Sequence, residues 1–213
     1  MDLAVGVPYD DDGGSVAGAV YILTLETYGY IKGAQKLSMH YVNWNAFYTL
    51  NANGHFGYSV AALGDVDGNG VVYLAEGARG NADVGSDAGA VYMIFLETNG
   101  KIKGAQQLSN LYGNLNAFYM LDASDNFGQS VAALGDVDGG GVVDLAVGAI
   151  RDADGGSSAG AVYLINFAQS HFETSDPTNT PVPDPTAVPA PALNGAADCR
   201  RCIESVPYRA SCA

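Results

Sequence analysis

Three copies of one pentapeptide set the framework of this chain. AGAVY occurs at residues 17–21, 88–92 and 159–163, so successive copies are 71 residues apart. Other short motifs keep the same spacing: GAQKLS returns as GAQQLS, FG recurs, and GDVDGNG at 64–70 returns as GDVDGGG at 135–141. Because no insertion shifts the register between copies, each repeat is predicted to be one structural unit that packs against the next.

Each unit is predicted to consist of β-strands. Short runs rich in Val, Ile, Tyr and Phe are bounded by Gly, Asp and Asn, and none keeps the 3.6-residue apolar period of a helix. The middle copy contains four such runs, within FGYSVAALGDV, VVYLAEGAR, GAVYMIFLE and KIKGAQQLS. Four strands at a fixed period are typical of a β-propeller blade, whereas a β-sandwich explains the strands but not the period. The sequence therefore predicts an all-β fold of four-stranded antiparallel propeller blades.

The order of the motifs resembles a known family. FG, DxDGxG, LAVGA and GAVY follow one another here as they do in the FG-GAP repeat of integrin α-subunit propellers and of related extracellular proteins. The resemblance covers residue 2 to about residue 167. It implies a seven-bladed propeller in which the DxDGxGxxD loop binds calcium between two strands of a blade.

The last acidic loop is the preferred candidate for a calcium site. The family pattern implies side-chain ligands at loop positions 1, 3, 5 and 9 and a main-chain carbonyl ligand at position 7. Positions 1, 3, 5, 7 and 9 hold Asp136, Asp138, Gly140, Val142 and Asp144. Three carboxylates and a carbonyl suit Ca²⁺, which takes six to eight oxygen ligands at about 2.3–2.6 Å. Water has to replace the side chain that position 5 lacks.

The preceding loop lacks its closing carboxylate. Its implied ligands are Asp65, Asp67, Asn69 and the carbonyl of Val71, but the ninth position is Tyr73. A neutral phenol offers one weakly basic oxygen and is a poor substitute for a carboxylate. This loop is therefore interpreted as a degenerate calcium site.

The repeats occupy most of the chain but do not complete a propeller. Residues 1–170 are assigned to them, as a partial copy at 1–55, a complete copy at 56–126 and a partial copy at 127–170. About two and a half blades cannot close a ring of the usual four to eight. The chain is therefore predicted to be a fragment, or the product of an incomplete gene model, and an assembly of several chains into one ring is the alternative. Its open blade edges are predicted to favour association.

The composition changes after the repeats. Residues 171–195 are rich in Pro and Thr, which predicts an extended, semi-rigid linker without a packed core. Residues 196–213 hold all three cysteines, Cys199, Cys202 and Cys212, and are interpreted as the start of a disulfide-containing extracellular segment. Half of a zinc site is the weaker alternative, because no second cysteine pair is present.

Charge and motif content argue against several functions. Lys and Arg number 9 against 23 Asp and Glu, giving a net charge of −14, so no nucleic acid partner is expected. No stretch approaches the roughly 18 apolar residues of a membrane span, and no signal peptide is visible at the start. The histidines, His40, His55 and His171, lie beside no recognisable nucleophile motif, so no enzymatic activity is predicted.

Together these features predict a calcium-binding, non-enzymatic module for cell adhesion or ligand recognition, with a protein or glycan ligand that the sequence does not identify. An extracellular or cell-surface location is expected from the family resemblance, the linker and the terminal cysteines. Two alternatives stay open. The first is that the chain is an accessory propeller domain of a secreted hydrolase or lyase. The second is that it is a wall or matrix scaffold protein.

Overall fold

A computed structural model of the chain describes residues 2–40, 44, 47–66, 68, 70–83 and 85–167. Its contacts divide the chain into one unit of residues 1–177 and a second unit of residues 178–213. The predicted linker and the predicted cysteine segment lie outside the described residues.

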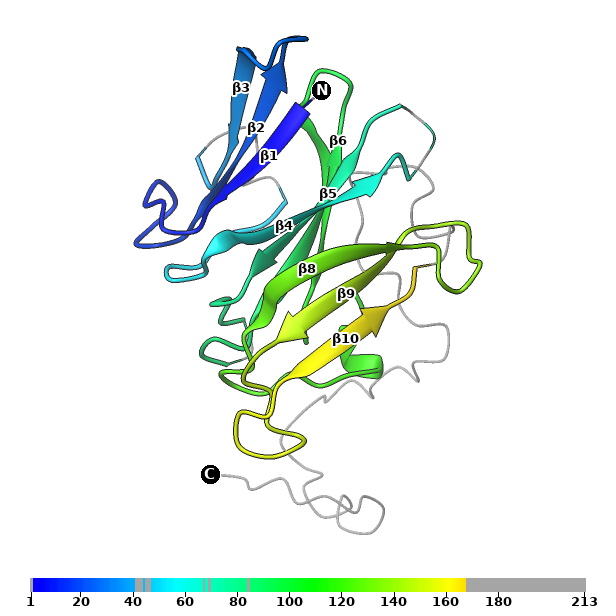
Figure 1. Cartoon of the computed structure of the whole chain (residues 1–213). Helices are drawn as coiled ribbons and strands as arrows, with labels where there is room; N and C mark the ends of the chain where they lie inside the picture. The colour runs from blue at the N-terminus through cyan, green and yellow to red at the C-terminus, as the bar shows by residue number, and fades with distance from the viewer. Residues whose placement is uncertain are drawn as a thin grey trace, which may run out of the picture. The chain divides into compact units, whose positions relative to one another are not determined.

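Ten strands of the described residues form three antiparallel sheets (Figure 1). The first sheet contains β1 (Asp2–Val7), β2 (Ala19–Leu25) and β3 (Ile31–Leu37). The second contains β4 (Phe56–Gly64), β5 (Tyr73–Ala78), β6 (Ala90–Leu96) and β7 (Ile102–Leu108). The third contains β8 (Phe127–Gly135), β9 (Asp144–Ala149) and β10 (Ala161–Ile165). Consecutive strands are neighbours in every sheet, and the sheets do not close into a barrel, so the all-β, blade-like fold predicted from the sequence is confirmed.

The strand register places each acidic loop at the same end of its sheet. Tyr73, at the ninth loop position, opens β5 and pairs with Gly64 at the end of β4. Asp144 opens β9 and pairs with Gly135 at the end of β8. The ninth position is therefore already part of a strand, and the hydrogen-bonded sheet fixes where its side chain points.

The FG dipeptides mark the places where one sheet meets the next. Both of their phenylalanines are fully buried, and Gly57 and Gly128 have φ angles of 79° and 86°, a left-handed conformation that glycine adopts without strain. Each also lies against a glycine of the preceding sheet. A Cβ added to Gly6 would overlap the carbonyl oxygen of Gly57, and one added to Gly77 would overlap that of Gly128. Glycine at these positions allows the backbones of neighbouring sheets to approach closely.

Two hydrophobic clusters fill the spaces between the sheets. The cluster between the first and second sheets is built around Trp44, Phe56 and Tyr92, whose ring centroids are 4.7–5.6 Å apart. The cluster between the second and third sheets repeats the pair as Phe127 and Tyr163, with centroids 5.3 Å apart. The same packing thus recurs with the sequence period.

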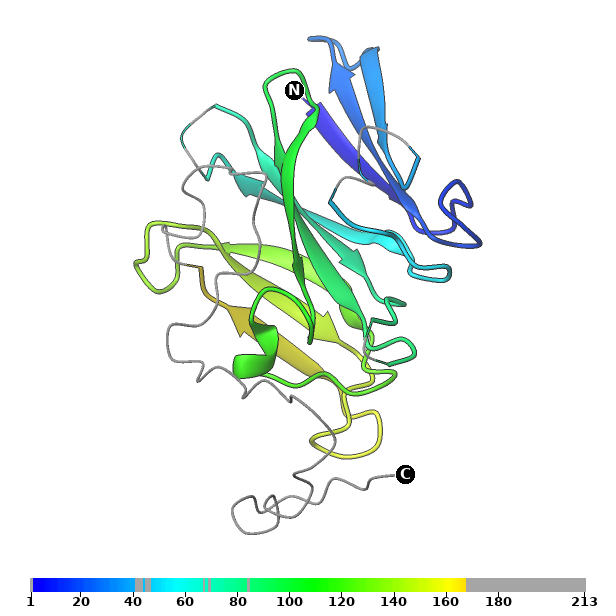
Figure 2. The ribbon, with the colours of Figure 1, turned by 180° about the vertical axis from the view of Figure 1, so that it is seen from behind.

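A short 3₁₀-helix, η2 (Leu115–Ala117), follows the second sheet along the chain. Leu115 is buried in the second cluster, and two residues after η2 the ring of Tyr119 lies 4.9 Å from that of Tyr163 in β10. Seen from behind in Figure 2, this segment crosses in front of the third sheet. The connection between the second and third sheets therefore contributes to the core.

Candidate functional site

The acidic loop between β8 and β9 brings three carboxylates together. One oxygen of each of Asp136, Asp138 and Asp144 lies within 4.8 Å of the other two. Asp136 and Asp138 are exposed, whereas Asp144 is fully buried. Oxygens that share one calcium ion at about 2.3–2.6 Å are at most about 5 Å apart. The spacing of these carboxylates therefore fits a calcium ion.

Two glycines curl the loop around these side chains. Gly139 and Gly141 have φ angles of 79° and 82°, which other residues rarely adopt. The curl allows the N–H of Gly141 to donate to Asp136 at 3.0 Å and the N–H of Gly140 to donate to Asp138 at 2.8 Å. The loop backbone therefore holds the carboxylates of positions 1 and 3 in place.

Asp144 is held from two sides. The N–H of Val137 donates to its Oδ2 at 2.8 Å, and the N–H of Phe167 donates to its Oδ1 at 3.0 Å. A buried carboxylate is tolerated when it accepts such hydrogen bonds. The closing carboxylate thus connects the start of the acidic loop with the chain that follows β10. Nothing in the sequence pattern pointed to Phe167.

Position 5 of this loop has no side chain, and an added one would lie close to the carboxylate of Asp138. A Cβ on Gly140 would lie 2.8 Å from Oδ1 of Asp138 and 3.1 Å from the carbonyl oxygen of Phe167. The side chain of Val142, whose carbonyl is the implied ligand at position 7, is buried. The structure therefore brings together the three predicted carboxylates, and the carbonyl ligand stays a prediction.

The loop between β4 and β5 follows the same backbone path. Gly68 and Gly70 have φ angles of 74° and 82°, and the N–H of Gly70 donates to Asp65 at 2.8 Å. Asp67 and Asn69, two of the predicted ligands, lie outside the described residues. The two loops therefore share this backbone conformation although their ninth positions hold different residues, Tyr73 and Asp144.

A lysine lies at the closing position of this second loop. The ammonium group of Lys103 in β7 donates to the hydroxyl of the buried Tyr73 at 3.2 Å and lies 5.9 Å from the centre of its ring. Val71, the predicted carbonyl ligand, is partly buried against the first cluster. A fixed positive charge beside the ninth position opposes the binding of a second cation. This lysine was not identified from the sequence.

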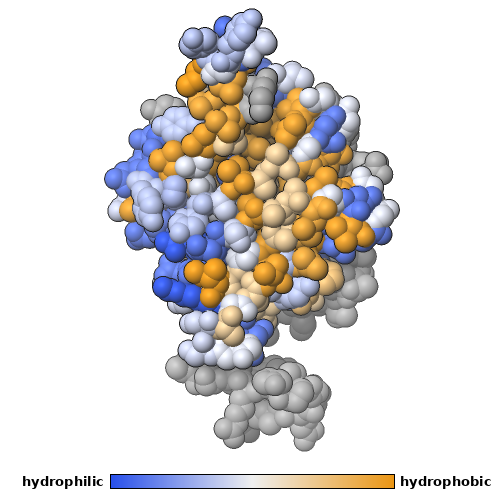
Figure 3. Space-filling view, in the orientation of Figure 1, coloured by the Kyte–Doolittle hydropathy of each residue, from blue (hydrophilic) through white to orange (hydrophobic). Residues whose placement is uncertain are grey.

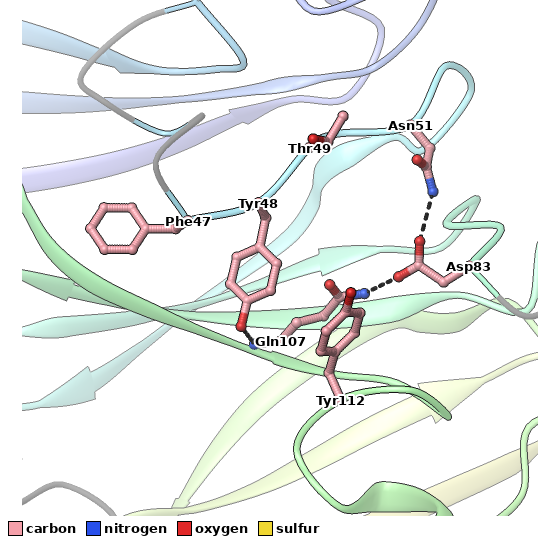
Figure 4. A pocket seen from close by; sticks show the side chains of 7 residues that line it. All are labelled: Phe47, Tyr48, Thr49, Asn51, Asp83, Gln107 and Tyr112. Carbon is pink, nitrogen blue, oxygen red and sulfur yellow. Dashed lines mark hydrogen bonds between the residues drawn. The ribbon is translucent and has the colours of Figure 1, made fainter. Parts of the chain in front are cut away.

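A separate cavity of about 310 Å³ lies where the β3–β4, β5–β6 and β7–β8 connections meet the end of β7 (Figure 4). It is lined by Phe47, Tyr48, Thr49, Asn51, Asp83, Gln107 and Tyr112. The carboxylate of Asp83 lines the cavity and accepts hydrogen bonds from the side-chain amides of Asn51, at 3.1 Å, and of Gln107. The cavity therefore presents one carboxylate whose position is fixed by two amides.

Tyrosine rings form one wall of this cavity. The rings of Tyr48 and Tyr112 meet edge to face, with centroids 5.8 Å apart, and the Tyr48 hydroxyl accepts the N–H of Gln107 at 3.0 Å. Burial raises the pKa of Tyr48 above its usual value, so its hydroxyl stays protonated. The wall thus combines aromatic surface with neutral polar groups.

The preceding repeat has a different interaction at the positions that correspond to Gln107 and Asp83. One period before Gln107 and Asp83 are Lys36 and Asp12, and there the Lys36 ammonium pairs with Asp12 and with Asp10, the latter at 2.7 Å. An ion pair thus takes the place that an amide has in the cavity. The recurrence of an aspartate at positions 12, 83 and 154 is the sequence signal that could have indicated this site.

These features define a propeller-type repeat module with an acidic loop in its blades. Residues 121–165 match the family model of the FG-GAP repeat, and this segment contains β8, the loop with Asp136, Asp138 and Asp144, β9 and β10. The chain therefore contains an FG-GAP repeat, and its likeness to integrin α-subunits is a general one.

FG-GAP repeats are typically found in extracellular proteins. Among the described residues, none of the helical segments has the length and apolar character needed to cross a bilayer.

Proposed function

We propose that this chain is a calcium-binding, non-catalytic recognition module of an extracellular protein. The observation that carries the proposal is the approach of three carboxylate oxygens to within 4.8 Å of one another in the loop of Asp136, Asp138 and Asp144. These residues, with the carbonyl of Val142, would hold the ion, and water would complete its coordination beside Gly140. The ion would supply the positive charge that offsets the repulsion between the carboxylates.

The role proposed for the ion is structural. Asp144 opens β9 and accepts hydrogen bonds from the backbone that follows each edge strand of the third sheet, from Val137 after β8 and from Phe167 after β10. Holding this carboxylate in place keeps the acidic loop and the chain after β10 together. The exposed Asp136 and Asp138 are the groups that gain most order from binding, because their carboxylates face solvent and accept hydrogen bonds from the loop backbone.

We assign no ion to the preceding loop. Its ninth position contributes a phenol instead of a carboxylate, and the Lys103 ammonium donates to that phenol. A lysine provides one positive charge without a metal, and it does so permanently. The proposal is therefore one calcium ion for the described repeats.

Calorimetric titration of calcium into the purified chain tests this assignment. The wild-type chain is expected to bind one equivalent, and Asp136→Ala to bind none. Asp65→Ala is the matched control, because Asp65 has the same loop position and the same hydrogen bond to a loop glycine. The assignment fails if the wild type gives no saturable heat, or if Asp136→Ala binds as the wild type does. Loss of an equivalent in Asp65→Ala would move the ion to the other loop.

For recognition, we propose that the cavity around Asp83 binds a neutral, hydroxyl-rich ligand such as a sugar residue. Asp83 accepts two amide hydrogen bonds and keeps further lone pairs for hydroxyl donors, while the tyrosine rings offer a surface for the apolar face of a sugar ring. A volume of about 310 Å³ is at the small end of ligand pockets and suits a single ring. The net charge of −14 disfavours anionic ligands.

Titration with a set of neutral methyl glycosides, followed by NMR, tests the cavity. At least one glycoside is expected to bind saturably, and Asp83→Asn is expected to weaken that binding by about tenfold or more. Asp154→Asn, one period later and outside the cavity, should bind as the wild type does. Absence of saturable binding across the set, or equal loss in both variants, would reject this ligand class and leave the calcium assignment untouched.

A further inference from the structure

A second cavity, of about 130 Å³, lies among four of the connections between strands. It is lined by His55, Arg79, Gly80, Asp87, Asn126 and Arg151. These residues belong to the β3–β4, β5–β6, β7–β8 and β9–β10 connections. Hydrophilic residues gather on the left side of the view in Figure 3, the side on which Figure 1 shows most of these connections. The cavity is therefore bounded by polar connections and not by the outer face of a sheet.

The lining residues of this cavity carry an excess of positive charge. Arg79 and Arg151 are the two arginines of residues 1–177, and both line it. Asp87 is the one carboxylate among the lining residues, and among the described residues no carboxylate lies within ion-pair distance of either guanidinium. Burial, and then the charge of Arg79, lowers the pKa of His55, so its ring is neutral at pH 7. Two positive charges therefore face one negative charge.

The guanidinium of Arg79 is held in place by packing. It lies over the ring of Tyr58, 4.2 Å from the ring centroid, and one of its N–H groups donates to Gln129 at 3.4 Å. Its Nε is buried and has no hydrogen-bond partner among the described residues. A buried donor without a partner costs free energy, which an acceptor oxygen supplied by a ligand would offset. The group is thus positioned before a ligand arrives and has donors left for one.

The packing of neighbouring sheets does not require these two arginines. One period of 71 residues earlier, the positions of Arg79 and Arg151 hold Pro8 and Gly80. The first and second sheets pack together with these uncharged residues, as the second and third sheets do with the arginines. The guanidinium groups are therefore an addition to the repeating fold, made at one junction only.

We propose that this cavity binds the carboxylate of an acidic side chain of a peptide partner. A guanidinium offers two parallel N–H groups that match the two oxygens of a carboxylate. The volume of about 130 Å³ is well below the roughly 300 Å³ of the smallest typical ligand pockets. It suits one functional group on a slim alkyl stem and excludes the whole ring of an acidic sugar.

The net charge of −14 restricts the ligand to a single acidic group. At 0.1 M salt, exposed charges more than about 10 Å apart are largely screened, whereas the two guanidinium groups act on the bound group at short range. A polyanion would also meet the acidic surface outside the cavity. This inference goes beyond the proposed function and depends neither on calcium nor on a sugar in the cavity around Asp83.

NMR titration with a single glutamate residue, blocked as the N-acetyl N-methylamide, tests the inference at constant ionic strength. The Nε–H signals of Arg79 and Arg151 report on the cavity directly. The blocked glutamate is expected to bind saturably in the millimolar range, and the blocked glutamine to give no saturable shift. Methyl glucuronoside, which carries the same charge on a sugar ring, is expected to bind at least about fivefold more weakly than the blocked glutamate.

Three variants with matched controls separate the cavity from general charge. Arg151→Gln, at an exposed position, is expected to weaken binding about fivefold or more, whereas Lys101→Gln, which removes an exposed cation outside the cavity, should bind as the wild type does. Asp87→Asn should tighten binding about twofold or more, because the repelling carboxylate is lost. Asparagine tolerates the φ angle of 55° at this position. Glu26→Gln, outside the cavity, should leave the affinity unchanged.

The proposal is overturned if the blocked glutamate gives no saturable shift, or if the blocked glutamine binds equally well. Equal losses in Arg151→Gln and Lys101→Gln would also overturn it, because they would reduce the effect to overall charge. Tighter binding of the glucuronoside would reject the peptide side chain as the occupant. Circular dichroism verifies that each variant is folded, and an unchanged affinity in folded Asp87→Asn would contradict the proposal independently of Arg151→Gln.

Discussion

The backbone N–H of Phe167 donates a 3.0 Å hydrogen bond to the buried carboxylate of Asp144. These residues are 23 positions apart, and the bond joins the chain after β10 to the ninth position of the acidic loop. Val137 donates to the other oxygen of the same carboxylate. Asp144 is therefore a structural acceptor of the third sheet as well as a proposed calcium ligand, and the two roles can be separated by mutation.

Asp144→Asn is expected to destabilise the chain even without calcium. An amide can accept only one of the two backbone hydrogen bonds, so a buried N–H loses its partner, at a cost of about 1–3 kcal/mol in the free energy of unfolding. Denaturant unfolding in excess chelator measures this cost. Asp138→Asn is the matched control, because its exposed carboxylate should matter only when calcium is present. Equal stability of the two variants in chelator would show that the Asp144 bonds contribute nothing.

The loop between β4 and β5 should become a calcium site when its defect is repaired. Tyr73→Asp restores the closing carboxylate, and Lys103→Thr removes the ammonium group. The double variant is expected to bind two equivalents of calcium in calorimetry and to depend more strongly on calcium for its stability. Tyr73→Asp alone should bind the second ion more weakly, because Lys103 remains. A single equivalent in the double variant would show that Tyr73 and Lys103 are not what prevents binding.

Close approach of neighbouring sheets should make Gly77 intolerant of any side chain. A Cβ at this position would overlap the carbonyl oxygen of Gly128, which belongs to the rigid backbone of the next sheet. Gly77→Ala is expected to lower the free energy of unfolding by about 1–3 kcal/mol. Gly33→Ala is the control, since an added Cβ there meets nothing within 4 Å. A similar effect of both substitutions in denaturant unfolding would contradict this account of the sheet contact.

Glu76 is a buried carboxyl group in β5 at a position where the next repeat has Val147. Neither of its oxygens has a hydrogen-bond partner among the described residues, and burial raises the pKa of Glu76 well above its usual value of 4.5. The folded chain therefore holds this proton more tightly than the unfolded chain does. The associated stability is complete below pH 4.5 and is lost as the pH rises above it.

Glu76→Val is accordingly expected to raise the free energy of unfolding at neutral pH, by about 1–3 kcal/mol. The difference from the wild type should shrink as the pH falls toward 4.5, where the carboxyl group is protonated in both states. Unfolding measured across this pH range provides the comparison. Glu76→Gln should remove the pH dependence without gaining apolar packing. A stability difference that does not change with pH would show that the charge of Glu76 is not the cause.

The period of the sequence was sufficient to predict the sheets and the acidic loops. Strand runs and the loop motif are local patterns, and the family resemblance assigned ligand positions such as Asp136 and Asp138 within the loop. The fold confirmed this reading because each repeat contributes its own strands in order. Contacts between side chains that are far apart in the sequence were not predicted. Lys103 meets Tyr73, and Gln107 meets Asp83, through pairings that depend on how strands lie side by side.

The candidate site was likewise predicted only in part from the sequence. The three carboxylates were identified from loop positions, whereas the hydrogen bond from Phe167 depends on where the chain runs after β10. The cavity around Asp83 joins side chains of two repeats, and no single motif contains them. Residues from different repeats become neighbours only when the sheets pack, which is why local patterns did not reveal them.

Thermal unfolding of the purified chain, in excess calcium and in excess chelator, is the most direct test of calcium binding by Asp136, Asp138 and Asp144. Calcium at about a hundred times its dissociation constant adds about 2.7 kcal/mol of stability, so the account predicts a Tm higher by roughly 5–10 °C than in chelator. Asp136→Ala should have the same Tm in both solutions. Equal Tm values for the wild type with and without calcium would contradict the account.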